Sequence, residues 1–196
     1  IALPKVVGNL AGRSDRPALI CFMQGKGLGK EASRRLLALF EPSHRDVCLI
    51  AKHHFRTLQV DASKIPALSP TVVVVGTDGT VLAECSGAGA SPESLLEAMG
   101  KAFPPKVALA PLLKGWHALL RDLEDLDRSK EMLDLKRWEK SLGGRPTLDR
   151  KITALQQRIS AGEVEMLKRK AALCDKRRFL AGVGAGRSVS EGRNPF

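Results

Sequence analysis

The sequence predicts an α/β fold, a mixed sheet flanked by helices, followed by a long antiparallel two-helix hairpin and an extended C-terminal tail. Over residues 17–103, short apolar runs alternate with helical patterns, which is typical of strands and helices packed in layers. Residues 107–181 hold two long heptad patterns separated by a glycine-proline turn. Residues 182–196 are rich in Gly and Ser and carry no core pattern, so they predict an extended tail.

The first elements follow a short lead-in, residues 1–16, which holds at most one strand at 5–7. The apolar run 18–23 is typical of a strand buried on both faces. A glycine-rich loop follows it. Residues 30–41 then place apolar side chains at helical spacing until Pro42, which ends the predicted helix.

The second part of this region completes the predicted sheet. The apolar run 46–51 predicts another buried strand, and the poorly periodic segment after it predicts a short helix around 54–58 and then extended chain. A strand at 72–75, a Thr-Asp-Gly turn and a strand at 81–84 form a closing β-hairpin. A Ser-Pro-Glu start then opens a helix over 92–103.

A proline pair at 104–105 marks the boundary to the predicted helical hairpin, 107–181. Both helices carry apolar residues at steps of four and three, and we call these residues the seam. Lys130 and Arg137 fill two intervening seam positions. The predicted seam residues are Leu112, Trp116, Leu119, Leu123, Leu126 and Leu133 on the first helix, and Leu148, Ile152, Leu155, Ile159, Met166 and Leu173 on the second.

Glycine and proline define the turn between these helices. Gly143 and Gly144 end the first helix, and Thr147 is expected to cap the start of the second. Gly162 lies near the middle of the second helix and is expected to kink or weaken it. Two amphipathic helices joined by so short a turn bury their apolar sides by folding back on one another.

The composition of the chain favours some classes of binding partner over others. The 196 residues carry a net charge of +11 and a pI near 9.9, which favours an acidic protein, RNA or an anionic membrane surface over a neutral partner. The alternative is a basic surface with no single partner. Aromatic residues make up 4% and Tyr is absent, which argues against stacking surfaces for single-stranded nucleic acid. The sequence contains no run of about 20 apolar residues, so it predicts no transmembrane helix.

The residues that usually carry chemistry are scattered. The four cysteines form no closely spaced pair, which argues against a zinc site, and Cys21 and Cys48 are expected to act as small buried hydrophobes. The neighbouring His53 and His54 cannot easily bind one metal and are interpreted as surface residues. His117 is expected on a helix surface. We therefore expect no catalytic residue, metal, cofactor or small-molecule substrate.

The segment Ser69-Pro70-Thr71, followed by the closing β-hairpin and helix, resembles the C-terminal half of a thioredoxin domain. The resemblance covers roughly residues 17–103. It implies that Pro70 has a structural role, with a cis peptide bond before it, and faces the loop that holds the active site in that family.

The active-site thiols of that family are missing here. Thioredoxins place Cys-x-x-Cys after the first central strand, where the start of a helix lowers the pKa of the first thiol. The corresponding segment, 24–30, reads QGKGLGK and contains no cysteine. Its spacing also differs from phosphate-binding and dinucleotide-binding loops, although its backbone with Lys26 and Lys30 offers an alternative anion site. The resemblance is therefore to a redox-inactive member.

These observations predict a non-catalytic structural or interaction subunit, in which the thioredoxin-like domain is a platform and the basic hairpin and tail dock on other protein subunits. The first alternative is an RNA-contacting component of a ribonucleoprotein such as an organelle ribosome. The second is an oxidoreductase with a single accessible thiol, Cys85 or Cys174. The interaction candidates are Trp116, Trp138, Lys168, Arg169, Lys170, Lys176, Arg177 and Arg178.

The sequence begins at Ile1 rather than Met. We therefore expect an exported mature protein, periplasmic or extracellular, or one targeted to an organelle, from which a signal has been removed.

Overall fold

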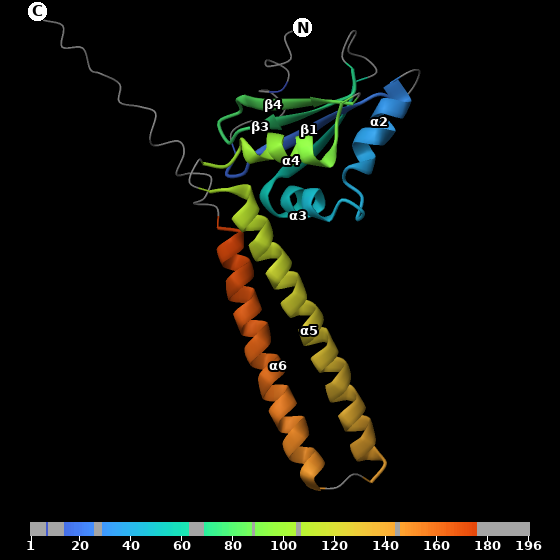
Figure 1. Ribbon diagram of the computed structural model, residues 1–196, viewed down its shortest axis with the longest axis vertical. Helices are drawn as coiled ribbons and strands as arrows, with labels where there is room; N and C mark the ends of the chain where they lie inside the picture. Colours follow the sequence, from blue (N-terminus) through green and yellow to red (C-terminus); the bar gives the residue numbers. More distant parts are fainter. Residues whose placement is uncertain are drawn as a thin grey trace, which may run out of the picture. The chain divides into compact units, whose positions relative to one another are not determined.

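The computed structural model of the chain describes residues 7, 14–25, 29–62, 69–87, 89–104, 107–143 and 146–175. They belong to two units: the part up to Leu109, which holds a mixed sheet with helices, and Ala110–Asp175, which is a long helical hairpin (Figure 1). The predicted tail and nearly all of the predicted lead-in lie outside the described residues. Within the described part, no helix combines the length and the apolarity needed to cross a bilayer.

The sheet has four strands: β1 (Ala18–Met23), β2 (Arg56–Asp61), β3 (Thr71–Val75) and β4 (Val81–Ser86). Their order is β2-β1-β3-β4. β1 is parallel to β2 and antiparallel to β3, and β3 is antiparallel to β4. This topology confirms the mixed sheet predicted from the sequence.

Burial follows the position of each strand in the sheet. Every residue of the two central strands, β1 and β3, is buried, and both are continuous apolar runs, apart from Thr71 in β3. Strand β2 lies at an edge and alternates between half-buried and exposed residues. A strand with neighbours on both sides and cover on both faces has no position for an exposed side chain, so its sequence loses the period of two.

Helices α2 (Gly29–Ala38), α3 (Arg45–His54) and α4 (Pro92–Gly100) pack on one face of this sheet (Figure 1). Their fully buried side chains include Leu36, Ile50, Leu95 and Met99. The opposite face has its own cluster, built from Val7, Ala18, Ile20, Phe22, Ala62, Val73 and Val75. Val7 is helical, so the strand predicted at 5–7 is wrong at the one position that the structure describes.

The prediction for residues 46–58 was wrong in both parts. The run predicted as a strand is the middle of α3, because its buried residues Val47, Ile50, Ala51 and His54 follow helical spacing. The apolar run looked continuous only because two half-buried residues stand between them. The segment predicted as a short helix is instead the start of β2, which hydrogen-bonds along the central strand β1.

The closing β-hairpin and its helix form as predicted. Gly79 adopts a φ of 87° in the turn, a conformation that glycine adopts at little cost. Asp78 Oδ1 accepts hydrogen bonds from the backbone N and the Oγ1 of Thr80, at 3.0 and 2.7 Å. Ser91 caps α4 through a reciprocal pair of hydrogen bonds with Ser94.

Pro70 lies buried at the mouth of β3. None of the peptide bonds in the described residues is cis, so the Ser69–Pro70 bond is trans and the cis bond implied by the resemblance is wrong. The Pro70 carbonyl accepts a hydrogen bond from the Gly87 N–H at 2.9 Å. A side chain at Gly87 would lie 3.2 Å from that carbonyl and 3.1 Å from Cβ of Ala32 in α2, so glycine permits a close approach there.

The second unit consists of the antiparallel helices α5 (Leu109–Ser141) and α6 (Pro146–Leu173) (Figure 1). Seam residues Leu126, Leu133, Ile152 and Ile159 form a buried cluster, and Leu148, Leu155 and Met166 pack against it. The predicted hairpin is therefore confirmed. Leu123 departs from the prediction because 36% of it is exposed, which places it at the border of the seam.

Two details of the hairpin differ from the sequence-based expectation. Helix α6 begins at Pro146, so Thr147 lies inside its first turn and is not its cap. Helix α6 also continues through Gly162 without a break. A Cβ at Gly162 would lie 3.1 Å from Leu126 Cδ1, so this glycine marks a close approach of the two helices. Gly143 ends α5 with a φ of 97°, as expected of a glycine cap.

Candidate functional site

The end of β1 and the start of α2 form the position where the resemblance places catalytic thiols. A hollow of about 320 Å³ lies there, lined by Gln24, Lys30, Ser33, Arg34, Asp61 and their neighbours. Ser33 Oγ accepts a hydrogen bond from the Gln24 N–H at 2.8 Å, so this hydroxyl holds the loop in place. The described lining contains no cysteine, and residues 26–28, including Lys26, lie outside the described part.

Burial raises the pKa of the thiols of the first unit, which disfavours the thiolate form. Burial in β1 raises the pKa of Cys21 from 9.0 to about 11. Burial also raises the pKa of Cys48 and of Cys85, and at Cys85 it outweighs the opposing charge of Lys101. Cys85 is only 8% exposed, so the expectation that it is accessible was wrong. Cys174, just after α6, is half-buried.

His53, His54 and His117 lie in different environments. His54 is 1% exposed and packs edge-on against Phe103, with ring centroids 5.6 Å apart, so its assignment to the surface was wrong. His53 is half-buried, and His117 is exposed on α5 as predicted. Among the residues that the structure describes, no group of three or more His, Cys, Asp or Glu side chains is placed to hold a metal ion.

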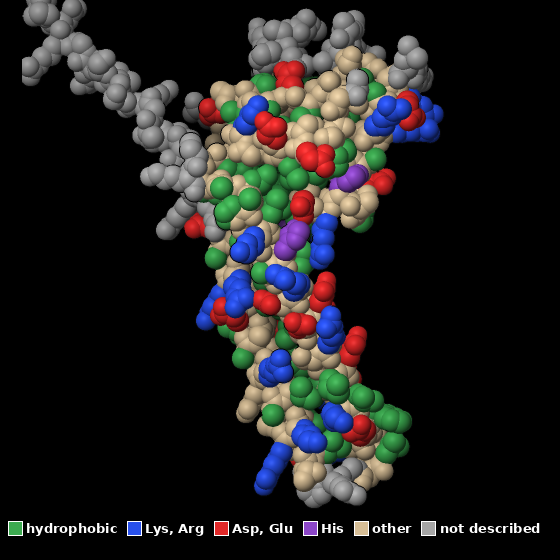
Figure 2. Space-filling model, in the orientation of Figure 1, with side chains coloured by type: hydrophobic (Ala, Val, Ile, Leu, Met, Phe, Trp, Pro, Cys, Tyr) green, Lys and Arg blue, Asp and Glu red, His purple; other side chains and the backbone are tan. Residues whose placement is uncertain are grey.

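Exposed apolar side chains, in contrast, concentrate on the hairpin. Of the eight large hydrophobic side chains exposed in the described residues, seven belong to α5, α6 or the residue after α5, and the eighth is Leu37. Figure 2 shows hydrophobic side chains gathered near the turn end of the hairpin. The seven are Leu123, Met132, Leu135, Trp138, Leu142, Val164 and Leu167.

Four of these side chains form one stripe along the last turns of α5, which we call the outer stripe: Met132, Leu135, Trp138 and Leu142. Their exposed fractions are 48, 48, 60 and 68%. At 100° per residue, steps of three, three and four keep all four within about 120° of the helix circumference. Seam residue Leu133 lies outside this arc, so the outer stripe is separate from the surface that packs on α6.

A second apolar surface lies where α5 and α6 meet, nearer the other end of the hairpin. We call it the open face; its exposed apolar residues are Leu123 and Leu167. A groove of about 390 Å³ runs along it, with Leu126 and Met166 in its wall. Lys130 and Glu163 also line the groove, and they form an ion pair of 3.0 Å between the helices.

The two predicted tryptophans have different environments. Trp116 is 2% exposed, so it is part of a packed interior and not a surface anchor. Trp138 is 60% exposed on the outer stripe, where a partner can reach it. Of the two, therefore, only Trp138 fits the predicted role in docking.

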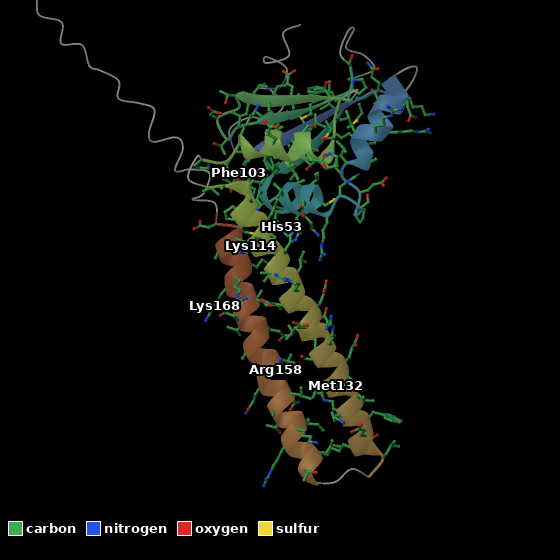
Figure 3. All side chains as sticks on the ribbon, in the orientation of Figure 1. His53, Phe103, Lys114, Met132, Arg158 and Lys168 are labelled. Atoms are coloured by element: carbon green, nitrogen blue, oxygen red, sulfur yellow. The ribbon has the colours of Figure 1, made fainter. Side chains whose placement is uncertain are left out.

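The predicted basic residues also differ from one another. Arg169 binds Asp122 across the hairpin at 2.6 Å and Glu165 along α6 at 3.0 Å. Lys168 and Lys170 are exposed, and Figure 3 labels Lys168 on α6 together with Arg158, with Met132 on α5. The remaining candidates, Lys176, Arg177 and Arg178, lie outside the described residues.

Charge is divided along the hairpin in a way that the sequence analysis missed. The turn end, residues 134–158, holds seven Lys or Arg and three Asp or Glu. The middle, 121–131 with 159–165, holds three and seven. The pairs Asp122–Arg169, Lys130–Glu163 and Lys140–Asp149 fix which residues lie at the same height on the two helices. The turn end of the hairpin is therefore basic. This excess becomes visible only when residues of the two helices that lie at the same height are grouped together.

No protein-family model matches the sequence, and a comparison with curated proteins finds no relative.

Proposed function

We propose that this protein is a non-catalytic interaction subunit whose hairpin docks on another protein of a larger assembly. The observation that carries the proposal is the concentration of exposed apolar side chains on the hairpin, seven of the eight in the described residues. Contiguous exposed apolar surface is costly for an isolated soluble protein and commonly marks an interaction site.

The sheet unit is proposed to be a thioredoxin-like platform without redox chemistry. The order β2-β1-β3-β4, with one parallel and two antiparallel pairs, supports the resemblance, whereas the trans bond at Pro70 departs from it. Raised thiol pKa values support the absence of redox activity, because the thiolate is the attacking form. If the wild-type protein reduces insulin and the Cys174→Ser variant does not, the protein would instead be a single-thiol oxidoreductase.

The outer stripe is the proposed contact with the partner. Its spacing of three, three and four residues is the pattern by which a helix fills an apolar groove of another protein. Trp138, the largest exposed side chain of the stripe, is the expected anchor, since tryptophans often carry much of the binding energy of an interface. The excess of basic residues at this end of the hairpin favours a groove bordered by acidic side chains.

The test is purification of the affinity-tagged full chain from its native source, followed by quantification of bound proteins. We expect a stoichiometric protein partner that is lost in the double variant Trp138→Ala, Leu142→Ser. The matched control is Leu37→Ser, which removes the exposed large hydrophobic side chain outside the hairpin, 43% exposed, and should retain the partner. A chain that purifies alone, or a partner that the double variant retains, would overturn the proposal.

RNA is the second candidate partner, favoured by the net charge of +11. Binding through phosphates predicts an affinity for a generic RNA duplex that falls steeply and linearly on a logarithmic salt scale. It also predicts a loss of affinity in Lys168→Ala, Lys170→Ala and none in Trp138→Ala. Filter binding at increasing salt separates the candidates, because docking through the outer stripe depends on Trp138 and only weakly on salt.

A further inference from the structure

The open face is a second interaction surface, distinct from the outer stripe. Leu167 is 68% exposed and Leu123 36%, and both helices line the groove of about 390 Å³ at this level. An apolar groove between two antiparallel helices is the site where further helices pack in a bundle, with side chains of one helix entering the holes of its neighbours. A helix that is apolar on one side therefore fits this groove.

Opposite charges flank the open face. On α5, Asp127 is one helical turn from Leu123, and Glu124 lies on the outer flank of the same helix. On α6, Lys168 lies on the outer flank, one turn from Val164 on the same side of the helix. A partner helix of a single charge sign would be attracted on one side and repelled on the other.

The register of the hairpin places these charges at matching heights. Arg169 of α6 lies level with Asp122 of α5, and Glu163 lies level with Lys130, as their ion pairs show. Glu124 lies two residues beyond Asp122 on α5. Its height along the hairpin therefore matches that of Lys168 to within about one residue, and each of these two side chains lies on the outer flank of its own helix.

We propose that the open face binds a second copy of this chain, so that two hairpins form a four-helix bundle. A two-fold axis parallel to the helices places α5 of one copy over α6 of the other. Glu124 of each copy then faces Lys168 of the other at the same height, and Leu123 of each copy packs against Leu167 of the other. Because the surface carries both signs, it is complementary to itself, as a two-fold interface requires.

The available area is sufficient for a dimer. Helix α5 has 33 residues, which corresponds to a length of about 50 Å at about 1.5 Å per residue. With two helices side by side, one face of the hairpin covers roughly 900 Å², and a specific interface needs about 800 Å² from each partner. Residues 109–175 carry 14 basic and 11 acidic side chains, so the hairpins repel one another little. The apolar contacts occupy only part of this length, which predicts a weak dimer with a Kd of about 1–100 µM.

The experiment is sedimentation equilibrium of the full chain at low ionic strength over a concentration range that spans the expected Kd. The wild type is expected to fit a monomer–dimer equilibrium. Leu167→Glu should weaken dimerisation at least tenfold, because it places a charge in the apolar contact. Leu142→Glu is the matched control: Leu142 is equally exposed, 68%, but lies on the outer stripe, so its variant should dimerise normally.

Charge reversal tests the orientation of the two copies. Glu124→Lys alone and Lys168→Glu alone should each weaken dimerisation several-fold, because each places like charges opposite one another twice in the dimer. An equimolar mixture of the two variants should regain the wild-type affinity, since both contacts in the mixed dimer again join opposite charges. Circular dichroism checks that each variant keeps its helices, and Leu167→Gln replaces Leu167→Glu should the latter lose them.

Three results would overturn this inference: a wild type that stays monomeric throughout, equal effects of Leu167→Glu and Leu142→Glu, or a mixture as weak as its components. The inference does not depend on the proposed function. Loss of a different protein partner follows Trp138, whereas loss of self-association follows Leu167, so either proposal can fail alone.

Discussion

The sheet unit and the helical hairpin bury their apolar side chains to different extents. In the sheet unit, the central strands have neighbours on both sides and cover on both faces, and residues such as Ile20 and Val73 are fully buried. In the hairpin, each helix has one packed side, and the seam residues Leu133 and Ile152 keep 7 and 9% exposure. The hairpin also leaves seven large apolar side chains exposed. The difference indicates that the described part of the sheet unit buries most of its large apolar side chains, while the hairpin exposes apolar surface that a partner can cover.

Polar interactions follow the same division. Among the described residues of the hairpin, ion pairs lie on the exterior, and three of them, including Lys130–Glu163, join the two helices. Such exposed pairs add little stability, but they set the register of one helix against the other. In the sheet unit, the Ser91–Ser94 cap is a local contact that fixes the start of α4. Charge therefore contributes to the register of the hairpin, whereas strand pairing sets the register of the sheet.

The largest effect is expected from the sheet core. Phe22→Ala removes a fully buried ring from β1 and should lower the free energy of unfolding by about 3–5 kcal/mol. Both tryptophans of the chain lie in the hairpin, so their fluorescence reports on that unit, while far-UV circular dichroism reports on the whole chain. Urea unfolding followed by both signals measures the effect. Leu37→Ala, at an exposed position, is the control and should change stability little; an equal loss there would contradict the assignment of the core.

A smaller effect is expected from the hairpin seam. Ile159→Ala removes a side chain that is 7% exposed and packs in a cluster covered on one side only. The neighbourhood can relax more easily than a sheet core, so we expect a loss of about 2 kcal/mol, at the lower end for such substitutions. The shift should appear in tryptophan fluorescence. A loss as large as that of Phe22→Ala would show that the two units are equally well packed.

The sequence predicted correctly those elements whose apolar pattern and end signals both indicate the same structure. Strands β1 and β3 are unbroken apolar runs, α4 has a Ser-Pro start, and the hairpin repeats its seam over several heptads. It failed at α3, where a run of apolar residues hides a helical spacing that ends in a buried histidine, His54. Only the tertiary environment, with Phe103 against the imidazole, shows why a histidine occupies that position.

The candidate site was predicted less well than the fold. Trp138 was selected for its residue type, but the stripe that it shares with Met132, Leu135 and Leu142 was overlooked, although its spacing is visible in the sequence. The seam is the stronger apolar pattern of α5, and a second apolar stripe on the same helix is recognisable only once the seam residues are assigned to packing. The open face could not be predicted, because it depends on the register between two helices.

Cys21 offers a test of how completely the sheet unit excludes water. Its pKa is raised from 9.0 to about 11 by burial, so the native state holds the proton more tightly than the unfolded state. The resulting stability is fully present below pH 9 and is lost as the pH rises towards 11, by roughly 2 kcal/mol in total. Cys21→Val should remove this part of the alkaline destabilisation. Thermal unfolding of both proteins from pH 8 to pH 11 measures it, and parallel curves would contradict the burial of the thiol.

The smallest effect is expected from the ion pair between Lys130 and Glu163, which joins the helices across the open face at 3.0 Å. The hydrogen bond that Lys130 donates to Glu163 raises the pKa of Lys130. The contribution of the pair is therefore present below the ordinary pKa of Lys130 and is lost as the pH rises through the raised one. Glu163→Gln should lower the melting temperature slightly at low salt and not at about 1 M salt, because exposed pairs are screened. Asp125→Asn breaks a pair of 3.5 Å with Arg128 that lies within α5 alone, and it should leave the register of the hairpin unchanged. If Glu163→Gln has the same effect at every salt concentration, packing and not charge holds the two helices in register at this point.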